Sequence, residues 1–193
     1  MKLSILTMAA ALVMTQTATA GMVHYAAALS GPAEAPPNAS PGTGSALVTY
    51  DDVALTMRVQ AQFSGLTGNV TASHIHCCTA VPGVANVGVA TPTPTFPGFP
   101  SGVTSGTYDS TFDMTLTSSF NNTFRTNNGG TAATALAALL AGMDAGSAYL
   151  NIHTSAFPGG EIRGFLQPVP EPSTMLLSGV ALAALAFVRR RRA

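Results

Sequence analysis

Positive charge is scarce in the central part of this 193-residue chain. Five of the eight basic residues lie near the two ends: Lys2, Arg189, Arg190, Arg191 and Arg192. Between Gly21 and Val169, three arginines face seven carboxylates, which gives this part a net charge of −4. That balance argues against a nucleic-acid partner, because binding to a phosphate backbone depends on clustered cations.

Motifs of several enzyme classes are also missing. The chain has no G-x-S-x-G nucleophile motif and no glycine-rich phosphate loop, so neither serine hydrolase chemistry nor nucleotide binding is indicated. Cysteine occurs only as the adjacent pair Cys77 and Cys78. In an oxidising compartment with no other thiol, we expect this pair to be oxidised, either to a disulfide between the two neighbours or to one between two molecules.

Both ends of the chain carry the patterns of export and membrane insertion. Lys2 precedes an apolar stretch, and Ala18-Thr-Ala20 forms a small-x-small cleavage site, so residues 1–20 are predicted to be a signal peptide. The apolar run from Met175 to Val188 with its polar shoulder is about 17 residues, roughly 25 Å as a helix, which just matches a bilayer core. We therefore predict a C-terminal transmembrane helix, with the four arginines after it in the cytoplasm.

A period of two in the apolar residues dominates the region between these ends. Apolar and polar side chains alternate from Leu55 to Phe63 and again from Tyr108 to Leu116, which predicts half-buried strands. Shorter strand patterns lie at Val23–Leu29, Ser45–Tyr50, Val70–His76, Tyr149–His153 and Glu161–Leu166. The alanine- and leucine-rich segment from Thr131 to Ala145 predicts one helix, and the proline-rich segment from Thr91 to Gly106 predicts a loop. Seven short strands indicate a single all-β domain, a sandwich or a barrel.

Two histidines on one predicted strand are candidate metal ligands. His74 and His76 are two residues apart, so an extended strand points both imidazoles to the same face, where they can reach one copper or zinc ion. If the strand continues, Cys78 shares that face and adds a soft ligand that favours copper. The alternative is that these side chains cover the solvent face of an antiparallel sheet without any ligand. His24, on the first strand, is expected to be structural.

Polar residues also mark the last two predicted strands. Glu161 and Arg163 share one strand face, and Tyr149, Asn151 and His153 share another. We expect Glu161 and Arg163 to form a half-buried ion pair that fastens the edges of the sheet, since charges inside a sheet require partners. The alternative is that Glu161 acts as a general base in a pocket with His153.

The C-terminal segment resembles a known sorting signal. A Pro-Glu-Pro motif, the apolar run and an arginine cluster follow one another, and these three parts in this order resemble the PEP-CTERM signal of bacterial envelope proteins. The residues of the two polar parts are Pro170, Glu171, Pro172, Arg189, Arg190, Arg191 and Arg192. The resemblance implies insertion in the membrane, recognition by an exosortase-type membrane protease, and release or attachment of the mature domain at the surface. The alternative is a plain C-terminal anchor.

The region before this tail resembles the CHRD domain, the module first named from chordin. The match rests on ordered landmarks: LSG at 29–31, EAPP at 34–37, FSGL at 63–66, ASHIH at 72–76, AYLNIH at 148–153 and PGGEIRG at 158–164. The resemblance implies that residues 21–168 form an extracellular domain without catalytic activity. Its expected fold is a Greek-key β-sandwich, immunoglobulin-like or superoxide dismutase-like, with one inserted helix.

A fainter similarity links the same motifs to copper/zinc superoxide dismutase. It implies that His74, His76 and His153 correspond to copper-site histidines and Arg163 to an anion-guiding arginine. The bridging histidine and zinc ligands of that family have no counterpart, because residues 79–106 contain neither histidine nor aspartate. The similarity therefore leaves at most a single copper or zinc site.

These patterns together predict a protein that is secreted or held in the cell envelope. Residues 169–193 form its sorting signal, and its domain is expected to be a non-enzymatic surface or extracellular-matrix module without a cofactor. The expected partner of that module is an extracellular polysaccharide or a surface protein. The alternative is a copper- or zinc-binding redox protein built on the three histidines.

Overall fold

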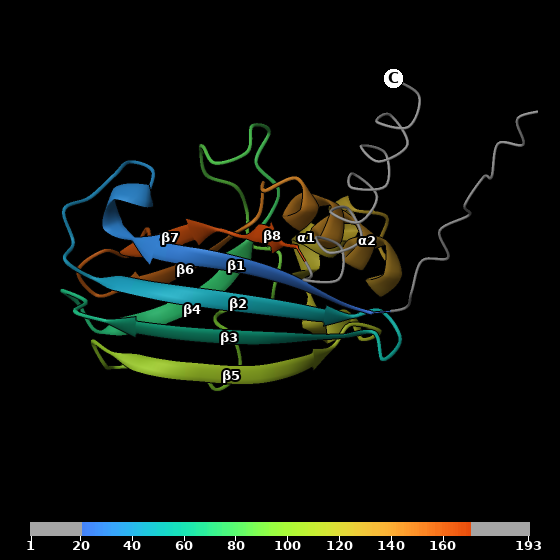
Figure 1. The fold of residues 1–193 in the computed structure, drawn as a ribbon, viewed down its shortest axis with the longest axis horizontal. Coiled ribbons are helices and arrows are strands. Elements are labelled where there is room, and N and C mark those ends of the chain that lie inside the picture. Colours follow the sequence, from blue (N-terminus) through green and yellow to red (C-terminus); the bar gives the residue numbers. More distant parts are fainter. Residues whose placement is uncertain (1–20, 171–193) are drawn as a thin grey trace, which may run out of the picture.

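The computed structural model describes residues 21–170 and shows an antiparallel sheet of eight strands, with two α-helices at one end of it (Figure 1). The strands are β1 (Met22–Ser30), β2 (Thr43–Asp51), β3 (Thr56–Ser64), β4 (Val70–His76), β5 (Gly106–Asp113), β6 (Tyr149–Thr154), β7 (Ile162–Phe165) and β8 (Gln167–Val169). Their order across the sheet is β4-β6-β7-β1-β2-β3-β5, and β8 also pairs with β1. Two short 3₁₀ turns, Gly31–Ala33 and Thr117–Ser119, follow β1 and β5.

The sheet curls, so that β4 lies behind β2 and β3 in the view of Figure 1. The predicted all-β class is confirmed, and the curled sheet fits a β-sandwich, although its strands form one continuous sheet. Strands β1, β2 and β3 form an antiparallel meander. The register of β1 against β2 runs without interruption from Met22 opposite Asp51 to Ser30 opposite Thr43, and the register of β2 against β3 is also continuous. The seven strand patterns of the sequence thus match observed strands, and β8 is a further strand that the sequence did not predict.

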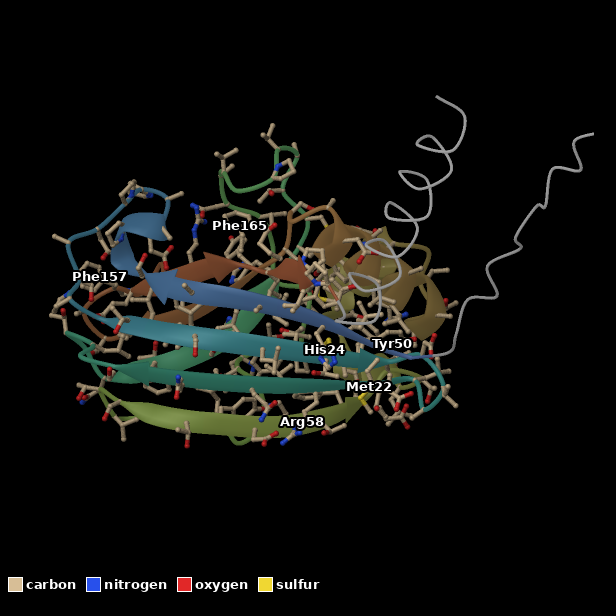
Figure 2. All side chains as sticks on the ribbon, in the orientation of Figure 1. Met22, His24, Tyr50, Arg58, Phe157 and Phe165 are labelled. Atoms are coloured by element: carbon tan, nitrogen blue, oxygen red, sulfur yellow. A yellow bond between two sulfur atoms is a disulfide. The ribbon has the colours of Figure 1, made fainter. Side chains whose placement is uncertain are left out.

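The core lies inside the curl and follows the period of two. Met57 and Val59 of β3 are fully buried, whereas Arg58 between them lies on the outer face (Figure 2). Arg58 forms an ion pair with Asp109 of β5, with 2.5 Å between the closest nitrogen and oxygen. The alternation therefore fixes which side chains fill the interior and which meet solvent.

Two helices stand where the sequence predicted one. The expected helix is α2 (Ala132–Asp144), which begins after a capping box formed by Thr131 and Thr134 and buries Leu139 and Met143. The additional helix is α1 (Asn122–Asn127), whose first turn is capped by the side chain of Asn121. Its asparagines and threonines are weak helix formers, so its six residues gave no signal by propensity.

A long loop, residues 77–105, runs along the free edge of β4. Its backbone nitrogens at Ala90, Phe96 and Gly102 donate hydrogen bonds of 2.9–3.0 Å to carbonyl oxygens of β4. The Phe96 ring packs against Tyr108 and Phe112 of β5, with centroids 5.8 and 5.4 Å away. The loop therefore spans the space between the two edge strands and covers one side of the site described below.

The predicted signal peptide, the predicted transmembrane helix and most of the sorting motif lie outside the described residues. Pro170 is the last residue of the described range and directly follows β8. The sorting residues beyond that range are Glu171, Pro172, Arg189, Arg190, Arg191 and Arg192. Within residues 21–170, no helix is both long and apolar enough to cross a membrane.

Candidate metal centre

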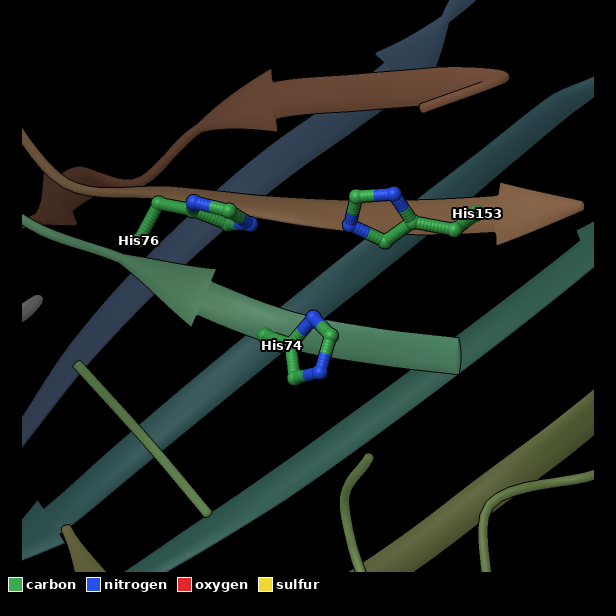
Figure 3. A group of neighbouring side chains, drawn as sticks. All are labelled: His74, His76 and His153. Atoms are coloured by element: carbon green, nitrogen blue, oxygen red, sulfur yellow. The ribbon is translucent and has the colours of Figure 1, made fainter. Parts of the chain in front are cut away.

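Strands β4 and β6 bring three histidines together on the outer face of the sheet (Figure 3). In the register of this antiparallel pair, Ala72 lies opposite His153. Opposite residues point to the same face, as do residues two apart on one strand, so His74, His76 and His153 share a face. Ile75, between the first two histidines, points to the core and is fully buried.

A backbone carbonyl oxygen holds one nitrogen of each imidazole. The contacts are His74 Nε2 to Pro94 O at 2.6 Å, His76 Nδ1 to Val87 O at 2.8 Å and His153 Nδ1 to Pro158 O at 2.9 Å. Because a carbonyl oxygen only accepts, each of these nitrogens carries the proton. The opposite nitrogens, Nδ1 of His74 and Nε2 of His76 and His153, are buried and have no hydrogen-bond partner. Each ring thus keeps a free lone pair.

The three rings form a nearly regular triangle. Their centroids are 5.3 Å apart for His74 and His153 and 5.8 Å apart for the two pairs that include His76. Three imidazoles bound to one ion through bonds of about 2.0–2.1 Å would have centroids roughly 5.2–5.5 Å apart. One potential ligand atom from each ring lies within 4.8 Å of the others. Ring movements of about 1 Å would close this triangle on an ion.

Burial lowers the pKa of all three imidazoles. The pKa of His76 falls to about 4, because burial acts together with the positive charges that His153, His74 and Arg163 can carry, against the hydrogen bond to Val87. Neutral imidazole is the form that binds metals. The cluster therefore holds its histidines in the binding form at physiological pH.

An aromatic and cationic stack lies beside the cluster. The Tyr149 ring is parallel to that of His76, with centroids 4.8 Å apart, and the guanidinium carbon of Arg163 lies 4.7 Å from the Tyr149 ring. Arg163 is 2% exposed, so it does not offer its charge to solvent as the dismutase similarity implied. Its nitrogens donate to the carbonyls of Ala33 and Ala85 and to the side chain of Asn86. Arg163 therefore holds two segments in place, the 3₁₀ turn after β1 and the loop of residues 77–105.

The predicted ion pair between Glu161 and Arg163 is wrong. Arg163 instead faces Glu34, with 3.8 Å between Nε and Oε2. Burial raises the pKa of Glu34 to about 7, in spite of the neighbouring guanidinium. The period of two along one strand placed the side chains of Glu161 and Arg163 on the same face of the sheet. The side chain of Arg163, however, extends to Glu34 in the segment after β1.

Glu161 has its own set of partners. Its carboxylate accepts hydrogen bonds from the side chains of Ser40 and Thr154 and from the backbone nitrogens of Thr67 and Gly68. Burial acts to raise the pKa of Glu161, but these hydrogen bonds outweigh it and lower the pKa. The carboxylate thus joins separate segments of the fold, as a structural group would. Among the described residues, the histidine cluster contains no carboxylate, so the general-base alternative has no geometric support.

The cysteine pair lies away from the histidines. Cys77 and Cys78 form a disulfide with each other, which settles the two expectations in favour of the bridge between neighbours. The sulfur of Cys78 lies 3.6 Å from the carbonyl oxygen of Ala138 in α2. The hypothesis that Cys78 adds a soft metal ligand is therefore wrong, because its sulfur is bonded to Cys77 and faces α2.

His24 is the one histidine outside the cluster. It lies on β1 near Met22 and Tyr50, at the helix end of the sheet (Figure 2). Its Nδ1 is 2.9 Å from the hydroxyl of Thr49. A structural role for His24, as predicted, agrees with this position.

Sequence reasoning missed the groups that orient the imidazoles. The three acceptors are backbone carbonyls of Val87, Pro94 and Pro158, and carbonyl positions leave no mark on residue type. Glu34 was part of a family landmark but had no predicted partner. The available signal was the density of proline in the loop of residues 77–105, which indicates fixed backbone without showing where it points.

Comparison with protein families decides the identity of the domain. The CHRD domain model matches residues 25–166, which is most of the described chain. The chain belongs to the CHRD domain family. A second model, the PEP-CTERM protein-sorting motif, matches residues 168–192. No curated protein and no solved structure matches this CHRD-domain protein.

The two family matches fix where this CHRD-domain protein works. A PEP-CTERM motif marks an exported protein with a C-terminal membrane-anchoring signal that an exosortase processes. The matched range includes every residue expected in the sorting motif, namely Pro170, Glu171, Pro172, Arg189, Arg190, Arg191 and Arg192. The protein is therefore secreted or located in the cell envelope. Neither family is an enzyme family, which is consistent with a non-enzymatic domain.

Proposed function

We propose that this exported CHRD domain is a binding module whose ligand is a single transition-metal ion, copper or zinc, held by His74, His76 and His153. The sorting signal brings the domain to the envelope or the exterior, and the proposed site gives it a ligand there. Imidazole nitrogen is a ligand that both metals accept.

The observation that carries the proposal is the set of three buried nitrogens without a hydrogen-bond partner. Leaving one buried polar atom unpaired costs about 1–3 kcal/mol. A histidine that only covered the solvent face of a sheet would find water for this atom. Three lone pairs that converge within a few ångströms of one another are instead accounted for by a shared metal ion.

Backbone hydrogen bonds at the opposite nitrogens give further support. In metal sites, the second nitrogen of a ligating histidine usually donates to a carboxylate or a carbonyl, which fixes the tautomer and the orientation of the ring. All three rings here meet that condition with a backbone carbonyl.

This proposal keeps the predicted class of the protein but changes its ligand. The expectation was a non-enzymatic module that binds a polysaccharide or a surface protein. The histidine cluster favours a metal as the ligand, without requiring a redox reaction. Glu161 and Arg163 are held by hydrogen bonds to other parts of the fold, so neither adds a catalytic acid or an anion-binding charge to the metal site.

Elemental analysis tests the proposal. The protein is purified in detergent, loaded separately with copper and with zinc, and freed of loose metal by gel filtration. We expect about one equivalent of at least one of the two metals in the wild type, because the three rings can enclose a single ion. The His153→Ala variant and the His74→Ala, His76→Ala double variant are expected to retain less than about a tenth of that amount.

His24→Ala is the matched control, since it removes a histidine outside the cluster and should leave the retained metal unchanged. Circular dichroism of each variant confirms that the fold is intact. Equal metal in the double variant and the wild type, or no retained metal in the wild type, contradicts the proposal.

A further inference from the structure

We propose that the histidine cluster is selective for copper in its univalent state, which it holds with three nitrogen ligands and no water, and that it discriminates against zinc. This inference rests on the proposed metal-binding function and deepens it by naming the ion and its coordination.

The three candidate ligand atoms are buried. The three unpartnered nitrogens are buried from solvent, and His74 and His76 are only 7% and 8% exposed. The carbonyl groups that hold the rings belong to the loops 77–105 and 155–161, which cover the cluster. The side chain of His153 is partly exposed, so the cluster lies at the edge of the covered region, with its free nitrogens turned away from solvent.

No aspartate, glutamate or cysteine of the described part of the protein joins the three histidines. Asn151 lies opposite His74 in the register, and its Oδ1 is buried without a hydrogen-bond partner. Its amide group lies beside Gly160 and Glu34. Zinc in proteins is almost always four-coordinate, with water in the fourth position when only three protein ligands are present.

Charge is a further argument. The three ligands are neutral, and the nearest stacked charged group is the guanidinium of Arg163, behind the ring of Tyr149. The cost of burying an ion in a medium of low dielectric constant rises steeply with its charge, and the neighbouring carboxylate, that of Glu34, faces Arg163 and does not join the histidine group. A univalent copper ion therefore fits this site better than a divalent ion does.

The arrangement of the rings agrees with three-coordination. Centroid separations of 5.3, 5.8 and 5.8 Å lie close to the value of about 5.5 Å that we estimate for a flat triangle of three ligands. With no open coordination position, the site would hold copper without presenting it to a substrate. The chemical class of ligand is thus Cu(I), and the corresponding role is copper storage or sequestration outside the cytoplasm.

Competition titrations test this inference on the full chain in detergent. Cu(I), kept reduced with ascorbate without oxygen, is titrated against the chromophoric chelator bicinchoninate, and Zn(II) is titrated against a chromophoric zinc chelator. We expect an affinity for Cu(I) at least about a hundredfold above that for Zn(II), since both charge and coordination number oppose zinc. X-ray absorption of the copper-loaded protein should give three nitrogen neighbours and no fourth.

One substitution should reverse the preference. Ala72 shares the face of His74 and lies opposite His153, so Ala72→Asp adds a carboxylate beside the cluster. This variant should bind Zn(II) at least about tenfold more tightly than the wild type, because it adds both a negative charge and a fourth ligand. Ala72→Ser is the matched control, and its zinc affinity should stay within about twofold of the wild type.

The outcomes separate the two proposals. Zinc affinity equal to or above that for Cu(I), or a four-coordinate copper with an oxygen neighbour, overturns the selectivity and leaves the metal-binding function standing. Failure to bind either ion overturns both.

Discussion

At the residue scale, orientation of the histidines by the main chain is the central feature of the protein. Each ring donates to a carbonyl oxygen that belongs to a covering loop, so the imidazoles depend on the loops for their tautomer as well as for their position. Among the described residues, no carboxylate or thiol joins the three histidines. Substitution of loop side chains that leave these carbonyls in place should therefore leave the cluster intact.

The contribution of Glu161 to stability is expected to depend on pH. Glu161→Gln should lower the free energy of unfolding by about 2 kcal/mol at pH 7. Thr67 and Gly68 donate to different oxygens of the carboxylate, and the amide nitrogen that replaces one of these oxygens cannot accept from a backbone N–H group. The pKa of Glu161 is lowered in the folded state. Its stabilising effect is therefore full well above the usual pKa of 4.5 and is lost as the pH falls below it.

Urea denaturation of wild type and variant at pH 7 and at about pH 3.5 measures this effect. The difference between the two proteins should shrink at the lower pH. An equal difference at both values would mean that the ionised carboxylate is not what stabilises this junction.

At the element scale, the loop of residues 77–105 connects the sheet edges and the site. Phe96 fastens the loop to β5, and the nearby Pro94 carbonyl holds His74. Phe96→Leu should cost about 1–2 kcal/mol of stability, less than the 3–5 kcal/mol typical of Phe→Ala. It should also weaken metal binding about tenfold, the lower end of the range for groups that orient ligands.

Phe63→Leu makes the same change on β3, where the ring stacks on Phe99, a residue of the same loop that lies farther from Pro94 than Phe96 does. Denaturation and metal competition, measured on both variants, compare loss of packing next to Pro94 with loss of packing farther along the loop. If both variants weaken metal binding to the same extent, the contact next to Pro94 has no specific role at the site.

Helix α2 yields a prediction in which packing opposes propensity. Alanine is favoured over glycine inside a helix by about 1 kcal/mol. At Gly142, however, a Cβ atom would collide with both sulfurs of the disulfide, and such overpacking costs about 1–3 kcal/mol or more. Gly142→Ala should therefore lower the melting temperature, whereas propensity alone would raise it.

Ala141→Gly, at the exposed neighbouring position of α2, provides the comparison. It should destabilise by about 1 kcal/mol through propensity alone. Thermal melts of both variants measure the two effects, and an increase in melting temperature for Gly142→Ala would show that α2 does not pack tightly on the disulfide.

The elements differ in how well the sequence predicted them. Strand periodicity located all seven predicted strands and the alanine-rich composition located helix α2, because burial of one face and helix propensity each impose a regular pattern. The same periodicity placed His74 and His76 on one face, and the resemblance to a metalloenzyme added His153. Helix α1 and the pairing of Glu34 with Arg163 were missed, because a short capped turn and a contact between distant segments leave no periodic signal.

At the scale of the whole molecule, the domain and its tail have separate tasks. The CHRD match ends at residue 166 and the sorting motif begins at residue 168. Strand β8 (Gln167–Val169) pairs with β1, so the sorting segment directly follows the sheet. The tail decides where the protein goes, and the described domain contains every residue of the proposed site.

Truncation after Val169 should separate these tasks. The shortened protein is expected to be exported and recovered in the soluble periplasmic fraction or in the medium, because it lacks the apolar run and the arginines. Its metal content per molecule should equal that of the full chain. Cell fractionation and elemental analysis measure both, and normal membrane retention of the truncated protein would contradict the role assigned to the tail.

Anomalous X-ray diffraction from crystals of the copper-loaded protein tests the central claim most directly. The account predicts one anomalous peak at about 2.0–2.1 Å from Nδ1 of His74 and from Nε2 of His76 and His153, with the other ring nitrogens still held by backbone carbonyls. A peak elsewhere, or a metal bound through the opposite nitrogens, would contradict it. The histidines would then be structural residues of the CHRD domain.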